Sequence, residues 1–75
     1  MPSKRDQIRN AAADFLRRVG EPMHNTKIAE AVLPSLGLAE SVTPKDVNTC
    51  LHDDPQNRFA RVAKGTWILK SEVRR

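Results

Sequence analysis

The sequence has few cysteine, glycine and aromatic residues, and it contains no long apolar run. Of 75 residues, one is cysteine, three are glycine and three are aromatic. A single cysteine excludes an internal disulfide and fits a reducing compartment. No stretch approaches the roughly twenty apolar residues of a membrane-spanning helix, and the N-terminus lacks a signal-peptide core. We therefore expect the protein to stay in the cytoplasm or the nucleus.

The chain also lacks the residue patterns of common chemical sites. Its scattered glycines form no phosphate-binding loop. The elements of a metal or nucleophile site are present in His24, His52, Cys50, Asp53 and Asp54, but their spacing fits no zinc motif. Cysteine–histidine catalysis would need a cleft and an oxyanion site, which a domain of this size rarely builds. We expect no metal, no cofactor and no enzymatic activity.

What is present is enough for one small domain. A length of 75 residues with 39% hydrophobic side chains supports a single core, near the lower limit for folding without disulfides or metals. We assign residues 1–75 to one domain with its core at about 5–70. Residues 71–75 are predicted to form a frayed, charged tail.

Positive charge is concentrated at the two ends of the chain. Residues 1–19 carry five Lys or Arg against two Asp or Glu, a net charge of +3. Residues 20–57 have a net charge of −4 from two basic and six acidic side chains, and residues 58–75 have +5 from six basic and one acidic. Net charge alone is weak evidence for nucleic-acid binding. Its segregation is better evidence, because it places the positive charge in separate regions.

A first helix is predicted to begin after Ser3 and to end before Gly20. Ser3 is a suitable N-cap, and Asp6 follows three residues later, as in a capping box. Apolar residues then recur at helical spacing as far as Val19, and Gly20 suits the C-cap. Four basic side chains lie off this apolar stripe, and the last two also suit the helix dipole: Arg5, Arg9, Arg17 and Arg18.

A short extended segment and a second helix are predicted next. Met23 is expected to point inward from the extended segment. Asn25 or Thr26 is expected to cap a helix that runs to about Leu33, because Pro34 should end it. A loop follows.

A third helix has the clearest start signal in the chain. Thr43 is a cap, Pro44 suits the first helical position, and Asp46 falls at the third. The helix is predicted to run to about Asp53. Its exposed face would present four polar side chains: Lys45, Asn48, Thr49 and His52.

The last third of the chain predicts a β-hairpin. Two β-prone runs, Arg58–Val62 and Thr66–Leu69, flank a connection of three residues that ends in Gly65. An isolated hairpin is barely stable in water, so the helices must cover its apolar side. Helix, short strand, helix, helix and hairpin is the order of a winged helix-turn-helix. The predicted fold is therefore α+β, mainly helical, with a C-terminal wing.

Several segments resemble the HARE-HTH winged-helix family over about residues 5–70. They are Gly20–His24, Lys27–Glu30, Thr43–Pro44 and Arg58–Trp67. The resemblance implies a DNA-associated module of the kind found attached to restriction-type nucleases, chromatin factors or a bacterial RNA polymerase subunit. It also implies a link to modified DNA bases. This chain departs from such proteins in containing the module alone. Either it acts alone, or it is a domain of a larger protein; in the second case a fused or associated nuclease or transcription protein is the expected partner.

Three groups of residues are predicted to contact DNA. In the wing they are Arg58, Arg61, Lys64 and Thr66, of which the basic ones are candidates for phosphate contacts. In the third helix they are Lys45, Asn48, Thr49 and His52; Asn is able to read adenine, and Thr the thymine methyl group. At the N-terminus they are Lys4 and Arg5, with Arg9 beside them; these three either reach the DNA backbone or form an ordinary solvated face. As an alternative, the wing charges are a solvated run that prevents edge-to-edge pairing of strands.

Trp67 has two interpretations. It either closes the core with Phe59 and Leu69, or stacks on a flipped or distorted base. The first is favoured because a domain of this size needs the buried area.

The sequence thus leads to one hypothesis and one rival. The hypothesis is a monomeric winged helix that binds double-stranded DNA, with helix ends and wing on the backbone and the third helix in the major groove. The rival is a protein-interaction module of a transcription or chromatin complex, in which the acidic middle segment meets a basic partner. The rival is retained because Lys45 is the only basic side chain of the third helix, which is little positive charge for a helix between two phosphate backbones.

Overall fold

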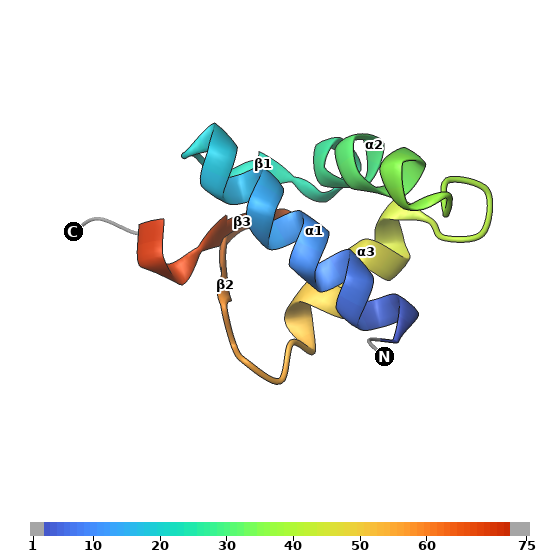
Figure 1. The fold of residues 1–75 in the computed structure, drawn as a ribbon. Coiled ribbons are helices and arrows are strands. Elements are labelled where there is room, and N and C mark those ends of the chain that lie inside the picture. The colour runs from blue at the N-terminus through green and yellow to red at the C-terminus, as the bar shows by residue number, and fades with distance from the viewer. Residues whose placement is uncertain (1–2, 73–75) are drawn as a thin grey trace.

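Three α-helices and a three-stranded antiparallel sheet make up the fold in the computed structural model, which describes residues 3–72 (Figure 1). In chain order the elements are α1 (Lys4–Val19), β1 (Met23–His24), α2 (Asn25–Leu36), α3 (Pro44–His52), β2 (Phe59–Ala63), β3 (Thr66–Leu69) and a 3₁₀ turn, η1 (Lys70–Glu72). The predicted order of helices and strands is confirmed. Ser71 and Glu72 belong to η1 where a frayed tail is predicted, and residues 73–75 of that tail lie outside the described residues.

Helix α1 begins and ends where its capping residues predict. The amide of Asp6 donates to Ser3 Oγ at 3.1 Å. At the other end Gly20 has a φ of 73°, and its N–H donates to the carbonyl of Leu16 at 2.9 Å. This left-handed conformation is accessible to glycine without strain, so Gly20 ends the helix.

The N-cap of helix α2 is His24, which precedes the predicted N-caps Asn25 and Thr26. Nδ1 of His24, rather than a side chain of Asn25 or Thr26, accepts from the Thr26 amide at 3.3 Å. The same ring nitrogen lies 2.8 Å from Thr26 Oγ1. An imidazole nitrogen is thus able to replace the usual hydroxyl or carboxylate acceptor at a helix N-terminus.

The prediction that Pro34 ends α2 is wrong. Pro34 lies inside the last turn, and the helix continues to Leu36. A proline there removes one backbone donor, and on this exposed side the last turn tolerates the loss. The helix ends at Gly37 instead, where the amide of Leu38 donates to Leu33 at 2.9 Å and that of Gly37 to Pro34 at 3.1 Å. This pair of bonds is the Schellman arrangement.

Helix α3 carries the predicted capping box. The amide of Asp46 donates to Thr43 Oγ1 at 3.2 Å, and the amide of Thr43 donates to Asp46 Oδ2 at 3.1 Å. The backbone and hydroxyl hydrogen bonds from Thr43 lower the pKa of the Asp46 carboxyl. The helix ends at His52, so the predicted end at about Asp53 is correct to one residue.

The sheet has the order β1-β3-β2, so the last strand lies in the middle. Met23 pairs with Trp67 on one side of β3, and Phe59 pairs with Leu69 on the other. The pairing of β2 with β3 shifts between Arg61 and Ala63, which leaves Val62 as the extra residue of a bulge. The connection is therefore two residues long, Lys64 and Gly65, rather than the predicted three.

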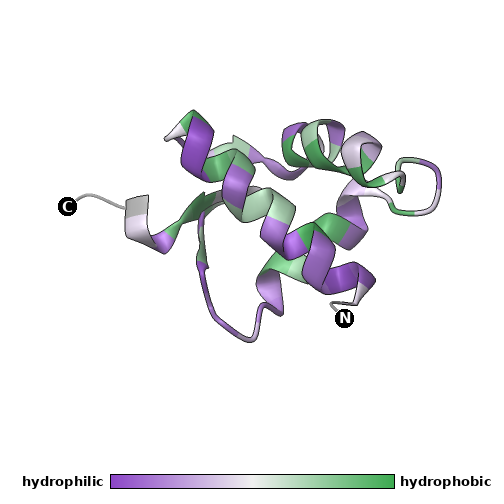
Figure 2. Ribbon diagram, viewed as in Figure 1, coloured by the Kyte–Doolittle hydropathy of each residue, from purple (hydrophilic) through white to green (hydrophobic). Residues whose placement is uncertain are grey.

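The core lies between the three helices and the inner face of the sheet. Figure 2 shows apolar residues along α2 and β3, and hydrophilic residues along the segment that leads from α3 into β2. Fully buried side chains come from each helix: Ile8, Leu16, Ile28, Val47 and Leu51. Trp67 is 3% exposed and lies in the same cluster as Phe59 and Leu69, which confirms its core interpretation. Within residues 3–72, no helix has both the length and the apolar character to cross a bilayer.

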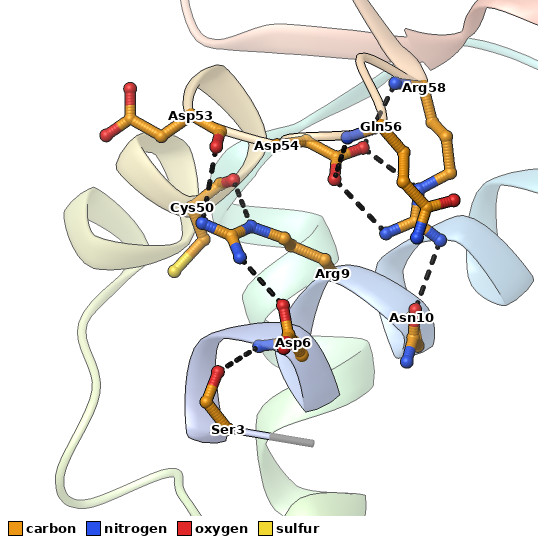
Figure 3. A network of polar contacts seen from close by, with 9 residues as sticks. All are labelled: Ser3, Asp6, Arg9, Asn10, Cys50, Asp53, Asp54, Gln56 and Arg58. Carbon is orange, nitrogen blue, oxygen red and sulfur yellow. Dashed lines mark hydrogen bonds and ion pairs between the residues drawn. The ribbon is translucent and has the colours of Figure 1, made fainter. Parts of the chain in front are cut away.

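Arg9 is a buried link between α1 and α3, which corrects its interpretation as a solvated side chain (Figure 3). Its Nε donates to the carbonyl of Cys50 at 2.9 Å, and a terminal nitrogen donates to that of Asp53 at 3.4 Å. The other terminal nitrogen binds the carboxylate of Asp6 at 2.9 Å. Carbonyls in the last turn of a helix lack partners within it, so Arg9 satisfies the end of α3 and is not available to DNA.

Candidate nucleic-acid interface

A groove separates the start of α3 from the tip of the β2–β3 hairpin. Its volume is about 390 Å³, and it is lined by His24, Asn25, Lys45, Asn48, Arg61, Lys64 and Gly65. We call it the basic groove. Four of the predicted DNA-contacting residues line it, two from α3 and two from the hairpin. None of the lining residues is acidic, and three of them are basic: Lys45, Arg61 and Lys64. Asp46, next to Lys45 in the chain, lies outside the lining.

Asn25 connects the two walls of the basic groove. Its backbone N–H donates to the carbonyl of Gly65 at 2.7 Å, which ties the hairpin turn to the start of α2. Its side-chain Nδ2 donates to the carbonyl of Pro44 at 2.9 Å, which ties α2 to the first residue of α3. A single residue therefore fixes the distance between the hairpin tip and the N-terminus of α3.

Gly65 allows the hairpin turn to approach α2 closely. Its φ is 69°, and a Cβ added there would lie 3.0 Å from His24 Nε2 and 3.1 Å from Asn25 Oδ1. Two effects therefore favour glycine at this position, the left-handed backbone and the close packing.

We expect Gly65→Ala to destabilise the protein more than Gly20→Ala. Gly20 has a similar φ of 73° with no atom within 4 Å of an added Cβ, so its substitution reports the backbone strain of about 1 kcal/mol alone. Gly65→Ala should cost about 1 kcal/mol more, because His24 and Asn25 must move. Chemical denaturation of both variants measures the difference. Equal losses would show that the turn is not held against α2.

The outer face of α3 is partly engaged within the protein itself. Asn48 Oδ1 accepts from Trp67 Nε1 at 2.8 Å. The hydroxyl of Thr49 donates to the carbonyl of Lys45 at 3.2 Å, and His52 Nδ1 lies 3.1 Å from the carboxylate of Asp53. Reading adenine requires both the oxygen and the nitrogen of an Asn side chain, so the Trp67 bond competes with such a role for Asn48.

Lys4 and Arg5 lie on the other side of this face. They line a second groove of about 190 Å³ together with Thr49 and Asp46. Successive helical residues are about 100° apart, so Lys45 and Asn48 fall on one side of the exposed α3 face and Asp46 on the other, with Thr49 between them. The exposed face of α3 is therefore bordered by basic side chains from the hairpin and from the N-terminus of α1.

Arg58 is not among the residues that line the basic groove, and its guanidinium is engaged inside the fold (Figure 3). Its Nε donates to Asp54 Oδ2 at 2.9 Å, and Nη1 donates to Asn10 at 3.1 Å. The guanidinium also lies 5.5 Å from the ring centre of Phe59. The structure therefore gives Arg58 a role in joining α1 to the start of the hairpin, instead of the predicted place on the wing's outer edge.

Thr66, the last predicted residue of the hairpin, lies beside the groove rather than in its lining. It pairs with His24 across β1 and β3, and its hydroxyl is 3.5 Å from the carbonyl of Lys64. Conversely, three residues that were not predicted to contact DNA line the groove: His24, Asn25 and Gly65. The family-like run Gly20–His24 was a signal for His24, whereas nothing local distinguishes Asn25.

One of the three acidic residues near the ends of α3 is buried. The Asp54 side chain is 1% exposed and accepts three bonds from the side chain and amide of Arg58 and a fourth from the Gln56 amide. Asp46 and Asp53 are exposed, although Asp46 accepts from Thr43 in the capping box. Both of these carboxylates therefore face an approaching polyanion, and only the charge of Asp54 is paired inside the fold.

The described residues offer little to other kinds of site. Between residues 3 and 72 there is no group of three or more His, Cys, Asp or Glu side chains placed to hold a metal ion. Burial raises the pKa of the Cys50 thiol, which disfavours the reactive thiolate.

Comparison of the chain with protein-family models, with curated proteins and with solved structures gives no match.

Proposed function

We propose that this domain is a winged helix-turn-helix that binds double-stranded DNA, with the β2–β3 hairpin as its wing. The observation that carries the proposal is the basic groove, which is lined by Lys45 of α3 and by Arg61 and Lys64 of the hairpin, and by no acidic residue. α3 has an exposed outer face and basic side chains on both of its sides, which suits a helix lying in a major groove between two phosphate backbones.

In this mode the backbone contacts supply most of the affinity. One DNA strand would pass between α3 and the wing, where three cations are held at a spacing that Asn25 fixes. The opposite backbone would approach Lys4 and Arg5. Each neutralised phosphate releases condensed counterions, which favours binding at low salt.

Base recognition is expected to be weaker than backbone binding. Asn48 is engaged by Trp67, and Thr49 and His52 have partners within the protein. From the resemblance to HARE-HTH domains we also propose a preference for modified bases. The domain would then act as the targeting module of a restriction-type or regulatory protein in the cytoplasm or nucleus.

The direct test is a titration of fluorescent duplex DNA at several salt concentrations. Five cations border α3, so the slope of log affinity against log salt should be about −3 to −5. Affinity should therefore fall at least about 60-fold between about 50 mM and about 200 mM salt. Absence of salt-dependent binding to every duplex tested, whether unmodified, cytosine-modified or adenine-methylated, would refute the proposal. A difference among the three duplexes would identify a modification preference.

Asn25→Ala should weaken DNA binding without changing its salt dependence. The substitution removes the bond to Pro44, so the wing and α3 lose their fixed spacing, and we expect about fivefold lower affinity from lost preorganisation. No charge changes, so the salt slope should stay the same. Lys64→Ala is the matched comparison, because loss of one phosphate contact should reduce the slope by about 0.9. Unchanged affinity of Asn25→Ala would show that the spacing does not matter.

A further inference from the structure

Asn48 has one amide atom held by the fold and the other open to solvent. Its Oδ1 accepts from Trp67 Nε1 at 2.8 Å, a bond that joins the middle of α3 to β3. Within residues 3–72 its Nδ2 has no hydrogen-bond partner, whereas every buried side-chain nitrogen or oxygen atom in that range has one. Nδ2 is therefore accessible to solvent, and Asn48 lines the basic groove.

The orientation of this amide follows from the chemistry of its partner. The oxygen and nitrogen of an Asn side chain are assigned from their hydrogen bonds. An indole N–H only donates, so it requires the oxygen at its position and excludes the NH₂ group. Trp67 belongs to the central strand and is 3% exposed, so its ring is held in the core. Turning the Asn48 amide by half a rotation would place two donors together and leave the indole N–H without an acceptor, which is costly in a buried position.

An Asn side chain held in this way offers a base only donors. Bidentate recognition of adenine needs the amide oxygen as an acceptor for N6–H and the amide nitrogen as a donor to N7. The oxygen of Asn48 is bound to a buried ring, so the N–H groups of Nδ2 remain for the base.

Guanine is the base that matches such a donor best. In the major groove it presents two neighbouring acceptors, N7 and O6. Adenine places a donor beside its N7, cytosine presents a donor, and thymine has one acceptor beside its methyl group. The preference is therefore the reverse of the adenine reading that the residue type alone suggests.

We infer that Asn48 selects guanine in the major groove and that Trp67 sets this preference by holding the amide oxygen. The inference rests on the proposed function, because it requires α3 to lie in the major groove of a duplex. Lys45 lies three residues earlier on the same side of α3, and its ammonium group also only donates. It therefore supplies no acceptor that would restore a preference for adenine.

The test is a selection from duplex DNA that is randomised over about one helical turn, or about 10 base pairs. The full chain should enrich guanine about fivefold at one position. Asn48→Ala should lose the preference at that position. Trp67→Phe keeps an aromatic ring in the core and removes the N–H donor, so the released Asn48 amide should enrich adenine there instead.

A titration with the selected duplex measures the contact itself. Replacing the selected guanine by 7-deazaguanine, which has a C–H group in place of N7, should weaken wild-type binding about threefold. The same replacement should leave the affinity of Asn48→Ala unchanged. This comparison needs no variant of Trp67, so it decides the question even if circular dichroism shows that Trp67→Phe is unfolded.

The bond between Trp67 and Asn48 is tested without DNA. Trp67 is the only tryptophan in the sequence, so its indole N–H gives one NMR signal. Hydrogen exchange of this N–H should be at least about tenfold faster in Asn48→Ala than in wild type. Equal exchange rates would show that Asn48 does not hold the indole, and the inference would fail.

The selection separates this inference from the proposed function. Recovery of duplexes without a base preference, or with adenine preferred by wild type, overturns the inference and leaves DNA binding intact. A guanine preference that persists in Asn48→Ala also overturns it, because another residue then reads the base. Recovery of no duplex by wild type overturns the proposed function and the inference together.

Discussion

Replacing Asp54 by asparagine is expected to lower the free energy of unfolding by about 3 kcal/mol. The carboxylate is 1% exposed and accepts from Arg58 Nε at 2.9 Å, from the Arg58 amide at 3.0 Å and from the Gln56 amide at 3.2 Å. Asparagine has one oxygen instead of two, and its NH₂ group would face donors. The Arg58 guanidinium would also lose its ion pair.

Such a loss is large for a chain of this length. A domain of 75 residues has a total stability of about 4–11 kcal/mol. The interaction joins the end of α3 to the start of β2, and Arg58 continues it to Asn10 of α1 (Figure 3). Loss of Asp54 should therefore loosen the hairpin from the helices.

Asp53→Asn is the matched control for this prediction. It makes the same chemical change one residue earlier, where the carboxylate is exposed and contacts only the exposed His52 ring among the side chains that the structure describes. Its cost should be below about 0.5 kcal/mol. Urea denaturation of the two variants and wild type measures both values. Similar stabilities of Asp53→Asn and Asp54→Asn would contradict the role of the buried carboxylate.

Acid should remove the same interaction. Burial raises the pKa of Asp54, but the hydrogen bonds from the Arg58 side chain and backbone and from Gln56 outweigh it and leave this pKa below the ordinary value of 3.8. The stabilisation is therefore complete above about pH 4 and is lost as the pH falls through the lowered pKa. Thermal unfolding should show the stability difference between wild type and Asp54→Asn shrinking steadily as the pH falls below 3.8. A difference that stays constant throughout the acid range would contradict the assignment.

The double variant Arg61→Ala/Lys64→Ala should bind duplex DNA about 50-fold more weakly than wild type at low salt. Both side chains are exposed, and they line the basic groove opposite Lys45. Removing two phosphate contacts should also make the salt slope less steep by about 1.8. Stability should change little, because neither side chain forms a hydrogen bond or ion pair that holds the described fold.

Arg17→Ala/Arg18→Ala is the charge-matched control. It removes two cations from the last turn of α1, where neither residue lines the basic groove. Affinity should fall no more than about threefold through the lower net charge alone. If the two double variants lose equal affinity, binding depends on overall charge, and the basic groove is not the interface.

Helix ends were predictable where a side chain or a glycine fixes the local backbone. Ser3, Gly20 and the Thr43–Asp46 box act within one turn, so short sequence patterns reveal them. Pro34 was misleading because its cost depends on the position within the helix, and the Schellman bonds at Gly37 outweigh it.

The parts of the site that sequence could not predict depend on contacts between distant residues. The sequence pattern places Arg9 on the surface of its helix. Its partners, the carbonyls of Cys50 and Asp53 at the end of α3, are 41 and 44 residues away in the chain. The two-residue strand β1 is too short for a periodic pattern, so its pairing with β3 was not foreseen, nor was the position of His24 beside Gly65. The basic residues Lys45, Arg61 and Lys64 were selected from charge, but their shared groove follows only from the sheet and from Asn25.

The most direct measurement is the NMR footprint of a short DNA duplex on the ¹⁵N-labelled chain. If the basic groove is the DNA interface, the amides of His24, Lys45, Arg61, Lys64 and Gly65 should shift together as duplex is added, and the effect should disappear at high salt. The amides of Glu30 and Ala39 should not move. Shifts centred on Glu30 and Ala39, or no shifts with any duplex, would contradict the account.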